Sequence, residues 1–160
     1  MFRIVPTLSE VTVSQARALF REYANTPGVV PCLEDFEREL ATLPGLYAPP
    51  GGRLLMAIEE GAEGSGEAMG CIALRKWESD VCEMKRLYVR PSFRGKGAGR
   101  ELVGTLISEA RAIGYKKMLL DTLPSMKESH KLYRTLGFRE IPSYQKNPIS
   151  GALFFELILH

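Results

Sequence analysis

The fold of this chain is restricted most strongly by a glycine-rich loop, Arg94-Gly95-Lys96-Gly97-Ala98-Gly99. The loop follows a strand-like run, Val81 to Val89, and opens an amphipathic run that predicts a helix from about Gly97 to Ile113. Glycines let the backbone come close to a ligand, and the free N–H groups at a helix start favour an anion. Strand, loop and helix in this order therefore predict a site for a pyrophosphate.

Two common nucleotide-binding fingerprints do not fit this loop. The dinucleotide pattern G-x-G-x-x-G, counted from Gly95, places Arg100 where its third glycine belongs. The Walker pattern fails because no Gly-Lys pair has the required glycine before it and Ser or Thr after it. Three cations, Arg94, Lys96 and Arg100, gather at the predicted helix start, where the helix dipole disfavours positive charge. Because a bound anion relieves that conflict, we favour a phosphate site over a purely structural turn.

Two sequence blocks carry a family resemblance. The stretch from Glu83 to Gly99 ends in R-x-x-G-x-G and resembles the acetyl-coenzyme A signature of the GNAT superfamily of N-acetyltransferases. Downstream, Leu132 to Phe138 reads L-Y-R-T-L-G-F and resembles the end of a later helix in the same family. The two blocks occur in the family's order and at its separation.

The resemblance implies an N-acetyltransferase that moves the acetyl group of acetyl-CoA to an amine acceptor by direct attack in a ternary complex. It also implies that the backbone at a strand edge hydrogen-bonds the pantetheine arm, in the way that it would pair with an added strand. The glycine-rich loop would hold the pyrophosphate. The donor-binding residues so implied are Leu87, Tyr88, Val89, Arg94, Gly95, Lys96, Gly97, Ala98, Gly99 and Arg100.

Tyr133 and Glu83 are the catalytic residues that the resemblance implies. Tyr133 would donate a proton to the departing thiolate, and a phenol suits this role because its usual pKa is about 10. Spacing alone also fits a core tyrosine. Glu83 would accept the proton of the amine; the alternative is an exposed strand carboxylate that pairs with Lys85 or Arg86. The family's common asparagine and alanine near the tyrosine are Met126 and Ser129 here, a departure that concerns the side-chain contact to pantetheine.

Hydrophobic periodicity predicts the element order β-α-α-β-β-β-α-β-α-β-β in a single domain, residues 1–160. The fold class is α/β (α+β), and the resemblance implies a mixed central sheet of about seven strands with helices on both faces. The first helix is predicted to start at Ser9, or at Thr12 with Gln15 as its capping box, and Ser125 with Glu128 predicts a capping box for the helix that ends at Leu136. Central and late strands are predicted at Arg53 to Glu59, Ala68 to Lys76, Val81 to Val89, Lys117 to Asp121, Phe138 to Ile141 and Ala152 to Leu159, with a solvated loop at 60–66.

Composition narrows the partners and the compartment. A net charge of +2 is too small to favour nucleic acid or a membrane surface, and no apolar run approaches the ~20 residues of a membrane span. Cys32, Cys71 and Cys82 form no C-x-x-C pair, so we expect reduced thiols in the cytoplasm, with a catalytic Cys82 as the alternative. No His, Cys or carboxylate set has metal-ligand spacing, so no metal is predicted, and His130 is assigned no role.

The acceptor is the part of the function that the sequence leaves open. We expect its pocket to be built by the two N-terminal helices and the segment Pro142 to Ser150. Acidic residues at 34–39 either attract a cationic acceptor or form a solvated face. The alternatives to acetyl transfer are a non-catalytic acyl-CoA sensor and an acyltransferase that uses a longer acyl-CoA. The apolar run Ala152 to Phe155 either pairs across a homodimer or fills the core.

Overall fold

The computed structural model describes residues 1–29, 33–61, 66–146 and 148–160, with only the backbone of 33 and 34. Much of the predicted 60–66 loop, and Cys32, lie outside these residues. The helices are α1 (Glu10–Ala24), α2 (Leu33–Thr42), α3 (Ala98–Ile113) and α4 (Lys127–Thr135). The strands are β1 (Phe2–Pro6), β2 (Arg53–Glu59), β3 (Ala68–Glu78), β4 (Val81–Val89), β5 (Lys117–Thr122), β6 (Arg139–Ile141) and β7 (Leu153–Ile158). The predicted element order and the mixed α/β class are confirmed.

All seven strands form one sheet in the order β1-β2-β3-β4-β5-β7-β6. Neighbouring strands are antiparallel except β4 and β5, which are parallel because α3 crosses over between them. Strand β7 lies between β5 and β6, and Phe154 to Glu156 pair on both sides. These residues therefore have no free edge for a second subunit, and burial of Phe155 explains the apolar run at the start of β7.

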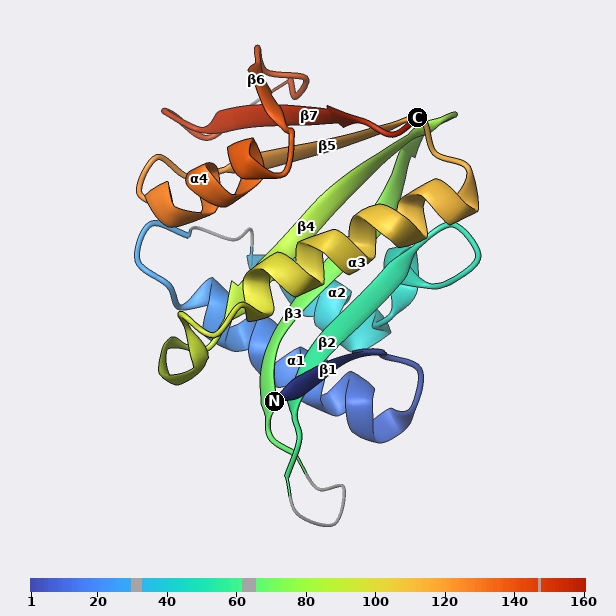
Figure 1. The fold of residues 1–160 in the computed structure, drawn as a ribbon, viewed down its shortest axis with the longest axis vertical. Helices are drawn as coiled ribbons and strands as arrows, with labels where there is room; N and C mark the ends of the chain where they lie inside the picture. The colour runs from blue at the N-terminus through green and yellow to red at the C-terminus, as the bar shows by residue number, and fades with distance from the viewer. Residues whose placement is uncertain (30–32, 62–65, 147) are drawn as a thin grey trace.

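Helices cover both faces of the sheet (Figure 1). On one face α3 buries Leu102, Leu106 and Ala110 against β2, β3 and β4. On the other, α1 and α2 bury Leu19, Phe20 and Leu40 against apolar side chains of β2 and β3, as the alternation of side chains along a strand requires. Among the described residues, no helix is both long enough and apolar enough to span a bilayer.

The helix starts test the capping predictions. Ser9 caps α1: its side-chain oxygen accepts a hydrogen bond from the Thr12 amide, and the Thr12 hydroxyl accepts one from the Ser9 amide. The predicted start at Ser9 is therefore confirmed, and the alternative start at Thr12 is wrong. The capping box predicted at Ser125 is also wrong. A turn in which the Met126 amide bonds to the Leu123 carbonyl delays α4 by one residue, and Met126 holds the cap position without a side-chain hydrogen bond.

Candidate active site

Divergence of two parallel strands creates the site. Strand β4 pairs with β5 only from Val81 to Glu83, and from Met84 to Val89 it pairs only with β3. Figure 1 shows β4 and β5 separating from a common end, with α4 above the opening and the loop before α3 below it. Backbone groups on one edge of β4 therefore face open space at the carboxyl ends of the two parallel strands, where α/β sheets bind ligands.

The larger cavity of this opening, which we call the donor groove, has a volume of about 570 Å³. It runs between β4, the glycine-rich loop and α4, and α1 contributes Tyr23. Every donor-binding residue predicted from the sequence lines it except Lys96, whose ammonium lies 5.4 Å from the ring centre of Phe93. The remaining lining residues include Tyr23, Thr26, Ser125, Met126, Ser129 and Leu132.

The glycine-rich loop has the geometry of an anion site. Gly95 and Gly97 have φ angles of +81° and +87°, in the left-handed region that favours glycine. A Cβ atom built on either residue meets no atom within 4 Å, so space lies beside both. In the described part of the chain, none of the amides from Gly95 to Arg100 donates a hydrogen bond. Donors without partners next to open space fit the pyrophosphate of a nucleotide.

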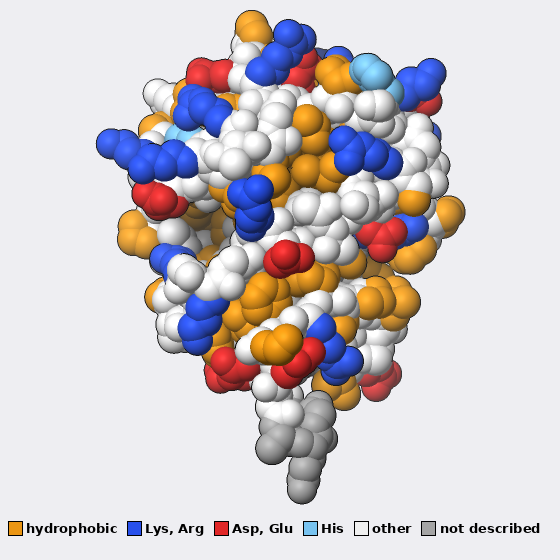
Figure 2. All heavy atoms as spheres, viewed as in Figure 1, with side chains coloured by type: hydrophobic (Ala, Val, Ile, Leu, Met, Phe, Trp, Pro, Cys, Tyr) orange, Lys and Arg blue, Asp and Glu red, His pale blue; other side chains and the backbone are white. Residues whose placement is uncertain are grey.

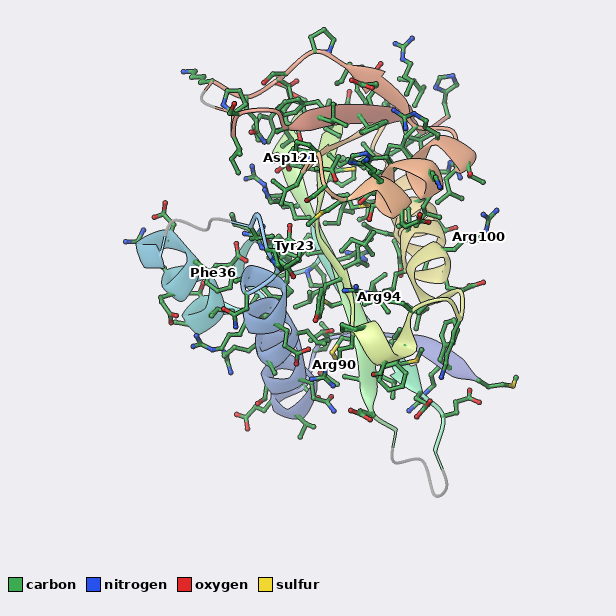
Figure 3. All side chains as sticks on the ribbon, turned by 90° about the vertical axis from the view of Figure 1, so that its left-hand side faces the viewer. Tyr23, Phe36, Arg90, Arg94, Arg100 and Asp121 are labelled. Atoms are coloured by element: carbon green, nitrogen blue, oxygen red, sulfur yellow. The ribbon has the colours of Figure 1, made fainter. Side chains whose placement is uncertain are left out.

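Cations surround the same groove. The Nε of Arg94 donates to the Val89 carbonyl at 2.9 Å, and the Arg94 guanidinium lies 5.9 Å from the ring centre of Tyr88. Figure 2 shows Lys and Arg side chains at the left of the molecule, from the region of α4 down toward the loop. Arg94 and Arg100 lie on the α3 side of β4 in Figure 3. The loop thus combines unpaired amides with positive charge.

A second cavity, which we call the acceptor cavity, has a volume of about 240 Å³ and adjoins the donor groove. The two share Tyr23, Leu87, Met126 and Ser129 as lining residues. Figure 3 shows Tyr23 and Phe36 on the N-terminal helices and Asp121 across the opening from them. The other residues of this cavity include Val29, Met84, Lys85, Arg86, Thr122, Tyr133, Ile149 and Ala152. Both N-terminal helices and Ile149, from the segment Pro142 to Ser150, thus contribute.

Tyr133 lines the acceptor cavity although it is only 4% exposed. Its ring packs against Phe138 and Phe155, with ring centres 5.7 and 5.9 Å away. Burial raises the pKa of the Tyr133 hydroxyl well above its usual value, and nearby Tyr23 and Asp121 add to that rise. The tyrosine is therefore both a core residue and a protonated donor that faces a cavity.

Glu83 is completely buried, so the alternative of an exposed strand carboxylate is wrong. Its Oε1 accepts a hydrogen bond from Arg75 Nε at 2.9 Å, and its Oε2 accepts one from the Tyr144 hydroxyl at 2.7 Å. Glu83 lines neither the donor groove nor the acceptor cavity. Of its two suggested partners, Lys85 approaches to 3.9 Å, whereas Arg86 pairs with Glu39.

Two acceptor-cavity residues were missed from the sequence. Asp121 is the second-last residue of β5 and Lys85 lies on β4, and their charged atoms are 4.0 Å apart. A polar residue at the carboxyl end of a buried parallel strand is a signal that could have identified Asp121. Lys85 gives no such signal, because a lysine on a strand is usually solvated.

Cys82 and His130, the other side chains considered from the sequence, have the surroundings of structural residues. Burial raises the pKa of the Cys82 thiol to about 12, and Cys82 lines neither cavity, so it is not poised as a nucleophile. The Nε2 of His130 lies 2.9 Å from the Leu123 carbonyl, and burial lowers the pKa of His130. Within the described residues, no group of three or more His, Cys, Asp or Glu side chains is arranged to hold a metal ion.

Known proteins share both the sequence pattern and the fold. The sequence model of the acetyltransferase (GNAT) family matches residues 15–138. An uncharacterized N-acetyltransferase from Schizosaccharomyces pombe is 36% identical over 142 residues, covering 88% of this chain and 85% of that protein. A GNAT acetyltransferase from Staphylococcus aureus has a TM-score of 0.81 at 16% identity, covering 100% of both chains. A putative acetyltransferase from Salmonella typhimurium, solved with acetyl-CoA, has a TM-score of 0.71 at 22% identity, covering 99% of this chain and 94% of that one. The chain therefore belongs to the acetyltransferase (GNAT) family and is an N-acetyltransferase.

Proposed function

We propose that this N-acetyltransferase takes its acetyl group from acetyl-CoA and joins it to a small primary amine by direct attack in a ternary complex. The observation that carries the proposal is that the donor groove and the acceptor cavity adjoin at Tyr23, Leu87, Met126 and Ser129. Adjoining cavities permit direct attack of the amine on the thioester, because the reacting atoms of two molecules bound there lie close together.

The donor is held mainly by backbone. The edge of β4 at Leu87 to Val89, which no strand covers, would hydrogen-bond the pantetheine amides as an added strand does. The unpaired amides of the glycine-rich loop would bind the pyrophosphate, with Arg94 and Arg100 supplying positive charge. Because Lys96 lies outside the groove, we assign it no direct contact.

Tyr133 is the proposed general acid. Attack of the amine nitrogen on the thioester carbonyl gives a tetrahedral intermediate, which collapses with cleavage of the C–S bond. The electron pair of that bond leaves on sulfur, and the Tyr133 hydroxyl protonates it. A tyrosine with a raised pKa remains protonated at neutral pH and is available for this step.

Asp121 is the proposed general base, in preference to Glu83. An amine arrives as an ammonium ion, which loses one proton to water before its nitrogen has the electron pair for attack. Once it bonds to the carbonyl carbon, the nitrogen becomes strongly acidic and must lose a second proton. Asp121 lines the acceptor cavity, and its carboxylate accepts no hydrogen bond from the described residues, so it can take this second proton. Glu83 as the general base stays a prediction. It would need a group that relays the proton, because both Glu83 oxygens already accept hydrogen bonds, from Arg75 and Tyr144.

The test is release of coenzyme A from acetyl-CoA across a panel of amino acids, simple amines, polyamines, aminoglycosides and peptides. We expect release above the rate of hydrolysis with at least one class, and its loss in Tyr133→Phe. Binding of acetyl-CoA without release from any amine would favour the sensor alternative. Faster release of coenzyme A from a longer acyl-CoA than from acetyl-CoA would favour an acyltransferase that uses the longer acyl group.

We further propose a reducing, cytoplasmic setting, which is supported by the free, buried thiols of Cys71 and Cys82. A homodimer stays a prediction and, if one forms, it uses a surface other than Phe154 to Glu156 of β7, because these residues pair on both sides within the chain. Mobility in size-exclusion chromatography with light scattering measures the oligomeric state directly.

A further inference from the structure

An irregularity in β4 directs two cations to the same face of the sheet. Between the pairs Ala73↔Lys85 and Cys71↔Tyr88, β4 has one residue more than β3. The extra residue is at Arg86, whose φ of +61° lies in the left-handed region that a long side chain rarely adopts. The bulge reverses the alternation of side chains, so Lys85 and Arg86 both face α1 and α2 and both line the acceptor cavity. A backbone conformation of this kind persists only where the surrounding structure imposes it, and such residues cluster at active sites.

The charge of Arg86 is already balanced. Its Nε and one Nη donate to the two carboxylate oxygens of Glu39 at 2.9 and 3.0 Å, and Tyr47 donates to the same carboxylate. Its guanidinium also lies 5.9 Å from the ring centre of Tyr23. Arg86 is therefore held in place, with one Nη left without a hydrogen bond among the described residues.

The Lys85 ammonium, by contrast, has only long ion pairs and no hydrogen bond in the described part of the chain. Its side chain is only 21% exposed, and its Nζ lies 3.9 Å from Glu83 and 4.0 Å from Asp121. Both distances exceed that of a hydrogen bond, and the Glu83 oxygens are already engaged. Within the described residues, the Lys85 ammonium donates no hydrogen bond and the Asp121 carboxylate accepts none. The cavity thus presents an ammonium and a carboxylate side by side, each with hydrogen-bonding capacity to spare.

We propose that the acceptor carries a carboxylate next to its amine, as a free amino acid does; this rests on the proposed function. The acceptor carboxylate binds Lys85, helped by the free Nη of Arg86, and its amine lies against Asp121. The apolar groups of Phe36, Val29 and Ile149, which line the same cavity, contact the rest of the molecule. A zwitterion supplies a hydrogen-bonding partner to both the Lys85 ammonium and the Asp121 carboxylate, whereas a polyamine places a second cation against Lys85 and Arg86.

The size of the cavity supports a free amino acid over a protein chain. Its volume of about 240 Å³ lies below the usual range for sites that bind drug-sized molecules. A peptide that presents its N-terminal amine has an uncharged amide where the amino acid has a carboxylate. It would leave the largely buried Lys85 ammonium without a hydrogen-bond acceptor, which is costly.

The experiment compares the standard free amino acids with their amides, in the same coenzyme A release assay. For the best amino acid, we expect wild-type kcat/KM to exceed that of its amide by at least tenfold. In Lys85→Met, which keeps the length and removes the charge, we expect that ratio to fall toward one. Lys76→Met is the matched control, since Lys76 is exposed on β3 and lines neither cavity, and it should keep the wild-type ratio.

Each result has a distinct meaning. Equal or better turnover of the amides by wild type, or an unchanged ratio in Lys85→Met, would overturn the carboxylate proposal and leave acetyl transfer standing. No coenzyme A release from any amine would overturn the proposed function itself. Circular dichroism and acetyl-CoA binding of Lys85→Met show whether the variant is folded. If it is not, Lys85→Gln and Lys85→Arg replace it, and Lys85→Arg should keep most of the preference.

Discussion

Glu83 is a buried carboxylate whose partners suggest a positioning role. It connects β4 with Tyr144, whose ring packs edge-on against Trp77 and Phe154 at 5.1 and 5.3 Å. Tyr144 belongs to the segment Pro142 to Ser150, which also supplies Ile149 to the acceptor cavity. We therefore infer that Glu83 holds one wall of that cavity in place and lies outside the space proposed for the acceptor.

Glu83→Gln should consequently raise KM for the amine more than it lowers kcat, and leave the pH profile of kcat unchanged. We expect it to lower the free energy of unfolding by about 2 kcal/mol, below the loss for a fully buried pair because Arg75 is 28% exposed. Tyr144→Phe removes only the hydrogen bond and should raise KM by roughly tenfold, about 1.4 kcal/mol. If Glu83→Gln changed the acidic side of the pH profile of kcat and Asp121→Asn did not, Glu83 would be the general base instead of Asp121.

The proposed role of Tyr133 as general acid predicts how kcat depends on pH in the alkaline range. An acid works only while protonated, so its contribution is lost as pH rises through its pKa, and burial moves that pKa upward. We therefore expect wild-type kcat to show no alkaline fall up to about pH 10, and Tyr133→Phe to lower kcat about 100-fold or more at unchanged acetyl-CoA affinity. An alkaline fall with its midpoint near pH 8, absent from Tyr133→Phe, would contradict this assignment.

At the scale of elements, the start of α3 is specified by backbone conformation more than by side chains. Gly97 caps the helix with φ +87°, and a β-branched side chain there is strained and projects into the space proposed for phosphate. We expect Gly97→Val to weaken acetyl-CoA binding at least 30-fold in calorimetry, and Lys96→Ala to weaken it less than threefold, equivalent to about 2 and 0.6 kcal/mol.

Gly104→Ala is the control for that experiment. Gly104 lies within α3, lines neither cavity, and its added Cβ meets nothing within 4 Å. Alanine there should raise the free energy of unfolding by about 0.5–1 kcal/mol and leave the affinity unchanged. Equal affinity in Gly97→Val and wild type would mean that the phosphates bind elsewhere.

Across the whole molecule, what the sequence could predict depended on how local the signal was. The strands Arg53–Glu59 and Val81–Val89 match their predicted bounds because long apolar runs are bounded by turn residues. The glycine-rich loop is one contiguous segment, so its motif can be recognised in the sequence. The acceptor cavity gathers residues from Tyr23 to Ala152, and the bulge that turns Lys85 and Arg86 together depends on one φ angle. Tertiary packing produces both, and no local pattern encodes them.

The same dispersal makes ligand binding a property of the whole fold. The donor groove takes residues from α1, β4, α3 and α4, so an unfolded chain offers no comparable site. Acetyl-CoA at 100 times its dissociation constant should therefore stabilise the folded state by about 2.7 kcal/mol, a rise in Tm of about 5–10 °C for a chain of this length. Differential scanning fluorimetry measures this shift. Gly97→Val at the same acetyl-CoA concentration should show about one third of this shift or less, because its affinity is expected to be at least 30-fold weaker. A full shift in Tm for that variant would mean that acetyl-CoA binds outside the donor groove.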